Sequence, residues 1–260
     1  MYKVKNILAE INKIAPLSYA EKNDNVGMLI GDKEQAIDKI IVCLDVTKDV
    51  VWEAIEKKVN LIISHHPVIY GGVKCITSET NHIIYDLLKN NISVICAHTN
   101  LDIAPGGVNY ELFMLLDMAK MRPLKPADNA EGMSLGLVGE LRQSKEPSEF
   151  VKFIKKQLKA PIVRYVDGEK DIQKVAICGG SGMSLLDYVL KADVDAFVTG
   201  DVKHHDFIDA YNNGLTLIDA GHFSTENIIV KLLVEYLRRN FDDISIEIAE
   251  TGTDKIKHVI

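Results

Sequence analysis

Short apolar runs alternate along the chain with longer segments in which apolar residues recur every three or four positions. The short runs predict β-strands, and the longer segments predict amphipathic helices, because that spacing places apolar side chains on one helix face. The predicted strands are Lys39–Leu44, Asn60–Ile63, Ile92–Cys96, Leu135–Gly139, Ile162–Val166, Lys174–Ile177, Ala196–Thr199, Leu215–Ile218 and Ile244–Ile248. The predicted helices are Asn6–Ile14, Lys48–Lys57, Asn81–Lys89, Val108–Met118, Pro147–Leu158, Leu185–Leu190, His204–Tyr211 and Glu226–Arg239.

The repeated order of strand and then helix predicts the α/β fold class, with two α/β subdomains whose mainly parallel sheets are flanked by helices. A polar, proline-containing stretch, Arg122–Gly132, interrupts the alternation, and we interpret it as a linker. The expected division is therefore a first half at residues 1–128 and a second half at residues 129–260.

The composition narrows the class of protein. The 260 residues are 47% hydrophobic and 26% charged, which is typical of a folded domain and excludes a mainly disordered chain. A net charge of −7 argues against general nucleic-acid binding, which needs a basic face. We expect neither a membrane span nor a signal peptide, because no run approaches about 20 apolar residues. The four cysteines lack CxxC spacing, so neither a thiolate zinc site nor a disulfide framework is expected, and the cytoplasm is the expected location.

The histidines carry the clearest chemical signal. Six of the eight follow a predicted strand within a few residues, namely His65, His66, His98, His204, His205 and His222. In open α/β sheets, the functional crevice lies at the carboxyl ends of the strands. We therefore expect a metal site in the cleft at this edge of the sheets.

The segment Ser64-His65-His66-Pro67 offers two neighbouring imidazoles. Side chains that are adjacent in an extended segment point in opposite directions, so these rings suit two ions, or one ion and one supporting contact. The alternative is that they are two polar residues ending a strand.

The segment His98–Asp102 offers a carboxylate just before the loop Pro105–Gly107. Asp102 can bridge two cations there. The spacing leaves three roles open for His98, which are a metal ligand, an acid–base group and a hydrogen-bonded residue at a strand end.

The segment His222–Glu226 places an imidazole and a carboxylate within one helical turn of each other. Ser224 or Thr225 is expected to cap the helix that begins there. The two side chains can converge on a shared centre, although Glu226 alone would also suit the positive end of a helix dipole.

Together these segments predict a dinuclear site for two divalent cations, with the ligands His65, His66, Asp102, His222 and Glu226. Nitrogen and oxygen ligands without thiolate suit Zn, Fe, Mn, Co or Ni. Positions left for water favour a catalytic site over a structural one. His98 and His205 are the candidate catalytic residues, as carriers of protons.

Other polar residues allow two interpretations each. Asp45 suits a contact that supports a ligand, or a helix cap. The loops Gly179–Gly182 and Pro105–Gly107 can offer backbone N–H groups to an anion, or can simply be tight turns. Lys74 can meet a phosphate or lie in solvent.

Several segments, in this order along nearly the whole chain, resemble the Nif-three-like family, whose members are often labelled GTP cyclohydrolase I type 2 homologues. The matching segments are Asp24–Gly27, Ser64–Pro67, His98–Asp102, Gly200–His205 and Gly221–Glu226. The resemblance implies a dinuclear metal site on His65, His66, Asp102, His222 and Glu226. It also implies a toroidal homohexamer of two-domain subunits, with metal sites that face an internal cavity.

The leading hypothesis is a metal-dependent hydrolase similar to GTP cyclohydrolase I type 2, acting on a nucleotide or another phosphorylated small molecule. Two ions sharing a carboxylate would lower the pKa of a water and polarise the substrate. One alternative is a dinuclear-metal phosphoesterase. The other is a non-catalytic metal-binding or regulatory ring protein.

Overall fold

The computed structural model describes residues 1–128 and 130–259. Its internal contacts divide the chain into two compact units. Unit 1 combines Met1–Leu101 with Ile229–Lys255, and unit 2 combines Asp102–Ile228 with the C-terminal residues from Ile256. Each unit has a sheet and a hydrophobic core of its own, which confirms the predicted α/β class with helices flanking the sheets.

Unit 1 is built on a sheet in which β4, β5 and β6 occupy the centre. Its strands, in spatial order, are β13 (Ser245–Ile248), β4 (Lys39–Cys43), β5 (Leu61–Ser64), β6 (Ser93–Cys96) and β2 (Gly27–Ile30). The first four are parallel, whereas β2 runs antiparallel to β6. A separate antiparallel ribbon joins β1 (Tyr2–Lys3) to β3 (Ala36–Ile37).

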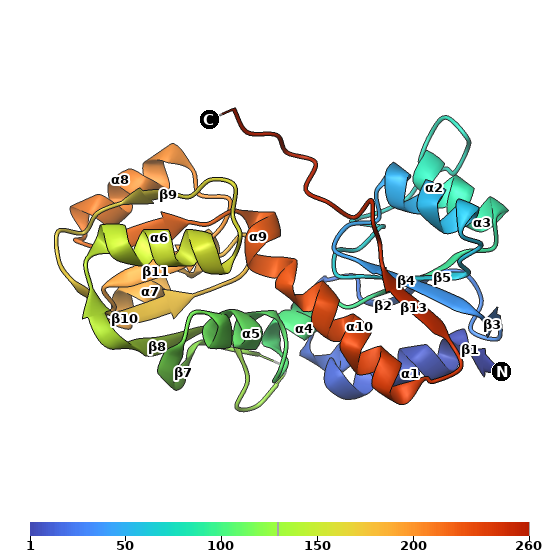
Figure 1. Ribbon diagram of the computed structural model, residues 1–260, viewed down its shortest axis with the longest axis horizontal. Helices are drawn as coiled ribbons and strands as arrows, with labels where there is room; N and C mark the ends of the chain where they lie inside the picture. The colour runs from blue at the N-terminus through green and yellow to red at the C-terminus, as the bar shows by residue number, and fades with distance from the viewer. Residues whose placement is uncertain (129, 260) are drawn as a thin grey trace. The chain divides into compact units, whose positions relative to one another are not determined.

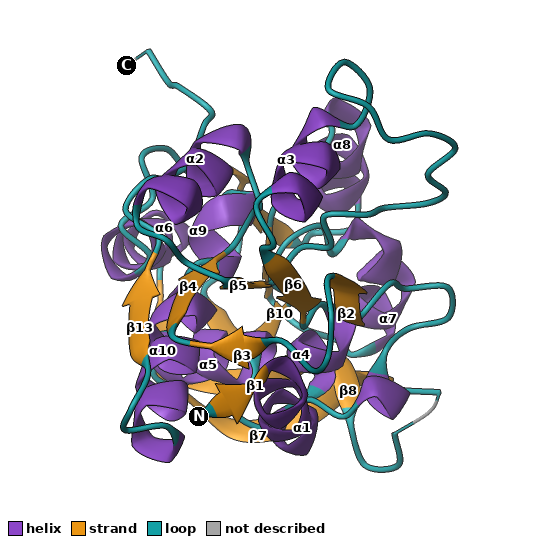
Figure 2. Ribbon diagram, turned by 90° about the vertical axis from the view of Figure 1, so that its right-hand side faces the viewer, coloured by secondary structure: helices purple, strands orange, loops and turns teal. Residues whose placement is uncertain are grey.

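Helices cover both faces of this sheet, and for that reason its central strands β4, β5 and β6 are apolar at almost every position. Helices α2 (Lys48–Glu56) and α3 (His82–Lys89) lie over one face, and α1 (Val4–Ile14) and α10 (Ile228–Asn240) lie over the other (Figure 1, Figure 2). The 3₁₀ turn η1 (Leu17–Tyr19) follows α1, and α4 (Thr99–Ile103) follows β6.

Unit 2 is built on a mixed sheet. Its strands, in spatial order, are β7 (Met118–Pro126), β8 (Ser134–Lys145), β10 (Ile172–Ile177), β11 (Ala196–Thr199), β12 (Thr216–Asp219) and β9 (Arg164–Val166). Strands β10, β11 and β12 are parallel, whereas β7, β8 and β9 pair antiparallel with their neighbours. The helices are α5 (Val108–Leu115), α6 (Pro147–Gln157), α7 (Leu186–Lys191) with the preceding turn η2 (Met183–Leu185), α8 (His204–Asn212) and α9 (His222–Glu226).

Two apolar clusters lie on opposite faces of the unit 2 sheet. On one face, Phe150 and Ile154 of α6 pack with Val175 and Val198. The other cluster includes Phe197 of β11, together with residues of α7 and α8. The three parallel strands are therefore covered on both faces. Their carboxyl ends lead into the segments that carry Gly180, Asp201 and His222.

The interpretation of Arg122–Gly132 as a linker is wrong. Residues up to Pro126 belong to β7, which forms an antiparallel hairpin with β8 (Figure 1). Prolines are tolerated in β7 because it is an edge strand, where a missing N–H leaves no neighbouring strand unpaired. The division expected after residue 128 therefore falls inside a hairpin of unit 2, and Asn129 lies outside the described residues.

Within residues 1–128 and 130–259, no helix combines the length and the apolar character that crossing a bilayer requires.

A buried carboxylate holds the segment that follows β13 in place. Glu53 of α2 accepts hydrogen bonds from the backbone N–H groups of Glu250 (3.0 Å) and Thr251 (2.8 Å), and from Lys57 (2.9 Å). Burial opposes ionisation of Glu53, but the hydrogen bonds from Thr251 and Lys57 prevail and lower its pKa from 4.5 to about 2. The ionised form therefore stabilises unit 1.

Glu53→Gln is expected to destabilise the chain at neutral pH and to do so less in acid. Because the folded-state pKa is lowered, the stabilisation is complete above pH 4.5 and is lost as the pH falls towards 2. The substitution should lower the free energy of unfolding by about 3 kcal/mol at pH 7 and by about 1.5 kcal/mol at pH 3. Urea denaturation at both pH values measures it, with Glu56→Gln, an exposed residue of the same helix, as the control. An equal loss at both pH values would contradict this role of the carboxylate.

Candidate metal centre

Unit 1 brings three of the predicted histidines together. His65 and His66 follow β5, and His98 follows the neighbouring parallel strand β6. The ring centroids are 5.1 Å apart for His65 and His66, 5.3 Å for His65 and His98, and 5.6 Å for His66 and His98. One potential ligand atom of each lies within 4.8 Å of the others. The three imidazoles therefore form one cluster at the carboxyl ends of two strands.

Each of these rings is oriented by an oxygen acceptor at Nδ1. The acceptors are the Ala97 carbonyl for His65 (2.8 Å), the Asp45 carboxylate for His66 (2.7 Å) and the Asp24 carboxylate for His98 (2.9 Å). An Nδ1–H donated to oxygen fixes the tautomer in which Nε2 carries the lone pair. Metal-binding histidines in proteins are usually held in this way.

Asp45 therefore supports a histidine, as one of its two interpretations predicted. The alternative, that it caps the following helix, is wrong, since Thr47 occupies the N-cap of α2 and its side chain accepts a hydrogen bond from the N–H of Val50.

Asp24 was not predicted as a site residue, although it begins the segment Asp24–Gly27 that the resemblance had singled out. Its side chain is 5% exposed and also accepts hydrogen bonds from the N–H of Thr99 (3.1 Å) and of Asn25 (2.8 Å). Burial opposes ionisation, but the hydrogen bonds with His98 and Thr99 lower the pKa of Asp24 to about 2. A carboxylate far away in sequence thus fixes His98.

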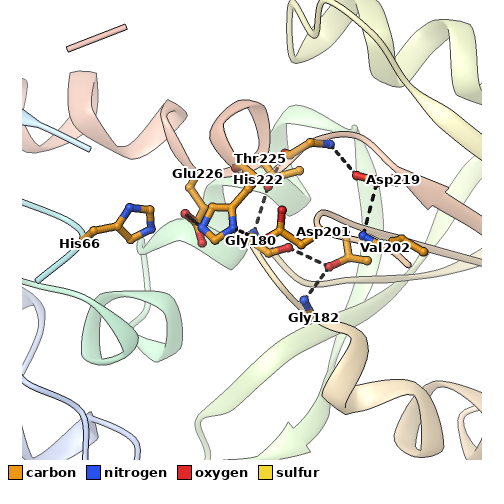
Figure 3. Close-up of polar contacts among 12 residues, drawn as sticks. His66, Gly180, Gly182, Asp201, Val202, Asp219, His222, Thr225 and Glu226 are labelled. Atoms are coloured by element: carbon orange, nitrogen blue, oxygen red, sulfur yellow. Dashed lines mark hydrogen bonds and ion pairs between the residues drawn. The ribbon is translucent and has the colours of Figure 1, made fainter. Parts of the chain in front are cut away.

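Unit 2 places His222 and Glu226 side by side on α9, one helical turn apart (Figure 3). His222 Nε2 lies 2.9 Å from Glu226 Oε2, and its Nδ1 lies 2.7 Å from Asp201 Oδ2. Burial disfavours the charged imidazole, but Glu226 and Asp201 outweigh it and raise the pKa of His222 to about 9. The predicted convergence of these two side chains is confirmed, and Asp201 is a further partner that the spacing did not single out.

The helix itself begins differently from the prediction. His222 is the first residue of α9 and not a residue before the helix. Thr225 does not act as a cap, because its hydroxyl lies inside the helix and donates to the carbonyl of Gly221 or of His222. A short break at Asn227 separates α9 from α10, where a single helix was expected.

The loop Gly179–Gly182 makes room for the carboxylate of Glu226. Gly180 has a φ of +61°, and a Cβ there would lie 2.0 Å from Glu226 Oε1 and 3.2 Å from His222 Nε2. The N–H of Gly180 donates to the Thr225 hydroxyl at 3.0 Å (Figure 3). The N–H of Gly182 likewise donates to the Thr199 hydroxyl at 2.9 Å, so the interpretation of this loop as an anion site is wrong, and the tight turn is the correct alternative.

Asp102, the remaining predicted ligand, lies on α4 in unit 2 and is 9% exposed. Its backbone carbonyl accepts a hydrogen bond from the Asn109 amide (3.1 Å), and the Asn109 Oδ1 accepts one from the N–H of Gly179 (2.9 Å). Asn109 therefore connects the backbone at Asp102 to the loop that borders Glu226.

His205 lies in the first turn of α8 with its side chain exposed, and its ring is 5.3 Å from that of His204. Lys74 is exposed in the loop between β5 and α3. The predicted roles of these two residues, and that of His98 in proton transfer, stay predictions.

The donor set fits a divalent transition-metal ion, since it consists of carboxylate oxygens and of imidazole nitrogens whose rings are held at Nδ1 by a second hydrogen bond. These groups could hold a metal ion. The histidines of β5 and β6 belong to unit 1, whereas Asp102, His222 and Glu226 belong to unit 2. The meeting of all five predicted ligands at one dinuclear centre stays a prediction.

Comparison with known proteins assigns the family. The model of the family described as Duf34/NIF3 (NGG1p interacting factor 3) matches residues 2–255. The chain belongs to the DUF34/NIF3 family. The predicted resemblance is thereby confirmed over nearly the whole sequence.

The relatives within the DUF34/NIF3 family include two clostridial proteins named GTP cyclohydrolase 1 type 2 homolog. The one from Clostridium acetobutylicum is 38% identical over 229 residues, covering 86% of this chain and 85% of that protein. The one from Clostridium perfringens is 33% identical and covers 99% of this chain and 100% of that protein.

Two solved structures that match the chain share its fold. Staphylococcus aureus protein SA1388 matches with a TM-score of 0.89 and 30% identity over 99% of each chain. The reduced HcgD protein from Methanocaldococcus jannaschii matches with a TM-score of 0.84 and 31% identity over 96% of this chain and 98% of that one.

Proposed function

We propose that this DUF34/NIF3 chain is a metal-dependent hydrolase with a dinuclear site on His65, His66, Asp102, His222 and Glu226. The observation that carries the proposal is shared by both units. Every histidine of the proposed set has its Nδ1 held by an oxygen acceptor, so each presents Nε2 as the ligand atom. A second hydrogen bond that fixes the orientation of the ring is typical of metal-binding histidines.

The pair His222 and Glu226 supports the same interpretation. With Nδ1 directed at Asp201, the contact between Nε2 and Glu226 requires a second proton on the ring. A cation between these two atoms would take the place of that proton, because imidazole and carboxylate are then both ligands. The raised pKa of His222 thus reflects the two carboxylates beside the ring, Glu226 and Asp201, which favour positive charge there.

Two divalent cations, when bound, would supply a water activated at neutral pH and would polarise the substrate. The chain itself would orient the site. Asp45 and Asp201 hold the tautomers of His66 and His222, and Gly180 keeps space open at the carboxylate of Glu226. His98, fixed through Nδ1 by Asp24, would accept a proton at Nε2, and His205 is the second candidate carrier.

The proposed reaction is the hydrolytic opening of the five-membered ring of a guanine nucleotide. Its support is the name of the two clostridial relatives, GTP cyclohydrolase 1 type 2 homolog. The match with this chain covers 85% of one relative and 100% of the other. Water would add at C8, and the bond from C8 to a ring nitrogen would break as that nitrogen takes a proton.

Metal-loaded protein incubated with GTP should therefore lose the absorbance of the purine ring. We expect turnover by the unmodified chain, and none above background by His65→Ala or Glu226→Gln. The control is His82→Ala, which removes an exposed histidine from the start of α3. Equal rates in all four proteins would exclude this reaction. Release of phosphate from GTP or from simple phosphoesters without ring opening would identify a phosphoesterase instead, and metal occupancy without any turnover would favour a binding role.

We further propose, from the family resemblance, that the chain assembles as a homohexamer in the cytoplasm. The four cysteines, which lack CxxC spacing, suit a reducing compartment, and the resemblance alone supports the ring.

A further inference from the structure

We propose that Asp219, with Arg164 beside it, is a positioning residue that holds Asp201 and His222 at hydrogen-bond distance. The inference rests on the proposed function, because it concerns how unit 2 orients one ligand of the proposed centre. It goes beyond that function by assigning a role to two residues outside the ligand set.

His222 and Asp201 come from two different segments of unit 2. Asp201 lies in the loop after β11, and His222 begins α9 after β12. The contact between His222 Nδ1 and Asp201 Oδ2, at 2.7 Å, therefore depends on how these segments are held against each other. The pairing of β11 with β12 ends at Thr199 and Asp219. Contacts beyond the strands have to hold the residues that follow.

The carboxylate of Asp219 joins the two segments. Its Oδ2 accepts a hydrogen bond from the N–H of Val202 at 3.3 Å (Figure 3). Its Oδ1 accepts one from the N–H of Gly221 at 3.0 Å. Val202 directly follows Asp201 in the chain, whereas Gly221 directly precedes His222. The two oxygens of one carboxylate, on a residue that is 6% exposed, therefore hold the immediate neighbours of both members of the pair.

Arg164 of the edge strand β9 fixes the same point. Its Nη2 donates to the carboxylate of Asp219 and, at 2.9 Å, to the carbonyl of Val202. The guanidinium Cζ also lies 5.4 Å from the ring centroid of Phe207, a contact that restrains the arginine. Arg164 thus compensates the charge of a buried carboxylate, which would otherwise be costly to bury. Because the N–H and the carbonyl of Val202 are both bonded, its backbone has little freedom to move.

The backbone of Asp201 needs this support. Its φ is +56°, in the left-handed region, which a residue with a Cβ occupies only at a cost in free energy. Such a conformation persists where the surrounding contacts determine it. Val202 supplies these contacts on one side. On the other side, Gly200 permits a close approach, since a Cβ there would lie 2.6 Å from the backbone nitrogen of His222.

A carboxylate with similar contacts at the other end of β11 provides the comparison. Asp195 directly precedes β11, and its Oδ2 accepts hydrogen bonds from the N–H groups of Gln173 (2.9 Å) and Lys174 (2.8 Å). Its Oδ1 lies 3.4 Å from the ammonium group of Lys170. Asp195 therefore also holds backbone and pairs with a cation, but it does so at the amino end of the strand. Its loss should affect the stability of unit 2 and not the geometry at His222.

Asp219→Asn and Asp195→Asn form a matched pair of full-length variants. Each replaces a carboxylate that accepts two backbone hydrogen bonds, so both should lower the free energy of unfolding in urea. Only Asp219→Asn should weaken the binding of Zn²⁺, by roughly 10-fold, as expected for loss of a group that orients a ligand. Equal Zn²⁺ affinity in the two variants would overturn the inference and leave the proposed function standing.

A second readout uses the metal-free chain and does not depend on the proposed function. The Nδ1–H of His222, donated to Asp201, should give a downfield proton resonance in NMR spectra, assigned by its absence from Asp201→Asn. We expect this resonance to remain in Asp195→Asn and to be lost from Asp219→Asn. An unchanged resonance in Asp219→Asn would contradict the positioning role. Its loss there, in a chain that binds no Zn²⁺ even when unmodified, would defeat the proposed function and support the positioning role.

If Asp219→Asn fails to fold, as judged by circular dichroism, Arg164→Gln takes its place. The side chain of Arg164 is 56% exposed, so its replacement leaves no large cavity. The variant should weaken Zn²⁺ binding several-fold and broaden the His222 resonance. The control is Arg142→Gln, which removes an exposed arginine that pairs with Asp117 at 2.9 Å, and it should change neither. Identical behaviour of the two arginine variants would overturn the inference.

Discussion

Glu226→Gln should reduce the affinity of the chain for divalent metal by roughly 100-fold or more. The side chain of Glu226 is only 5% exposed, and it faces Nε2 of His222 at 2.9 Å. Glutamine keeps the shape but replaces a charged oxygen ligand with a neutral amide, and loss even of a group that only supports a ligand typically costs 10- to 100-fold. Isothermal titration with Zn²⁺ at fixed pH measures the change.

A second readout needs no metal. Glu226 is one of the two groups that raise the pKa of His222 to about 9, so the pKa of that histidine should fall in metal-free Glu226→Gln, as followed by NMR. Glu149→Gln, which changes an exposed carboxylate of α6 in the same unit, is the control for both measurements. A variant that binds zinc as tightly as the control would remove Glu226 from the ligand set.

Gly180→Ala should also impair the site, through a residue that has no ligand atom of its own. The new Cβ would lie 2.0 Å from Glu226 Oε1 and 2.9 Å from Glu226 Cδ. The buried carboxylate would have to leave its place beside His222. We expect metal affinity to fall by about 10- to 100-fold. The free energy of unfolding should fall by about 1–3 kcal/mol, because φ is +61°.

Gly106→Ala separates these two effects. Gly106 has a φ of +72°, but a Cβ there meets nothing within 4 Å. The Gly106→Ala variant should therefore lose stability through backbone strain and keep its metal affinity. If both variants bind zinc equally well, the close approach of Gly180 to Glu226 has no part in the site.

Much of the fold could be predicted from the sequence because its signals are local. The strands of the parallel core are continuous apolar runs, and the helices carry apolar residues at the spacing of one face. The hairpin of β7 and β8 was missed because prolines and polar residues in an edge strand look like a linker. The pairing of β7 with Leu137 and Ser134 of β8 is a contact between two segments, and no pattern within β7 reveals it.

The candidate ligands could also be predicted, because strand order and strand ends place His65, His66 and His222 at the expected edges. The groups that orient them could not. Asp24 acts on His98 across 74 positions and Asp201 acts on His222 across 21, so nothing in the spacing distinguishes them from surface carboxylates. The role of Gly180 likewise depends on a contact with Glu226 that only the folded unit 2 creates.

The meeting of ligands from both units at one pair of cations is tested most directly by anomalous X-ray diffraction from metal-loaded crystals, recorded on both sides of the metal absorption edge. We expect two anomalous peaks in each subunit, within coordination distance of His65, His66, Asp102, His222 and Glu226. Peaks only at other residues, or none in a fully loaded protein, would contradict the dinuclear centre and the hydrolase proposed on it.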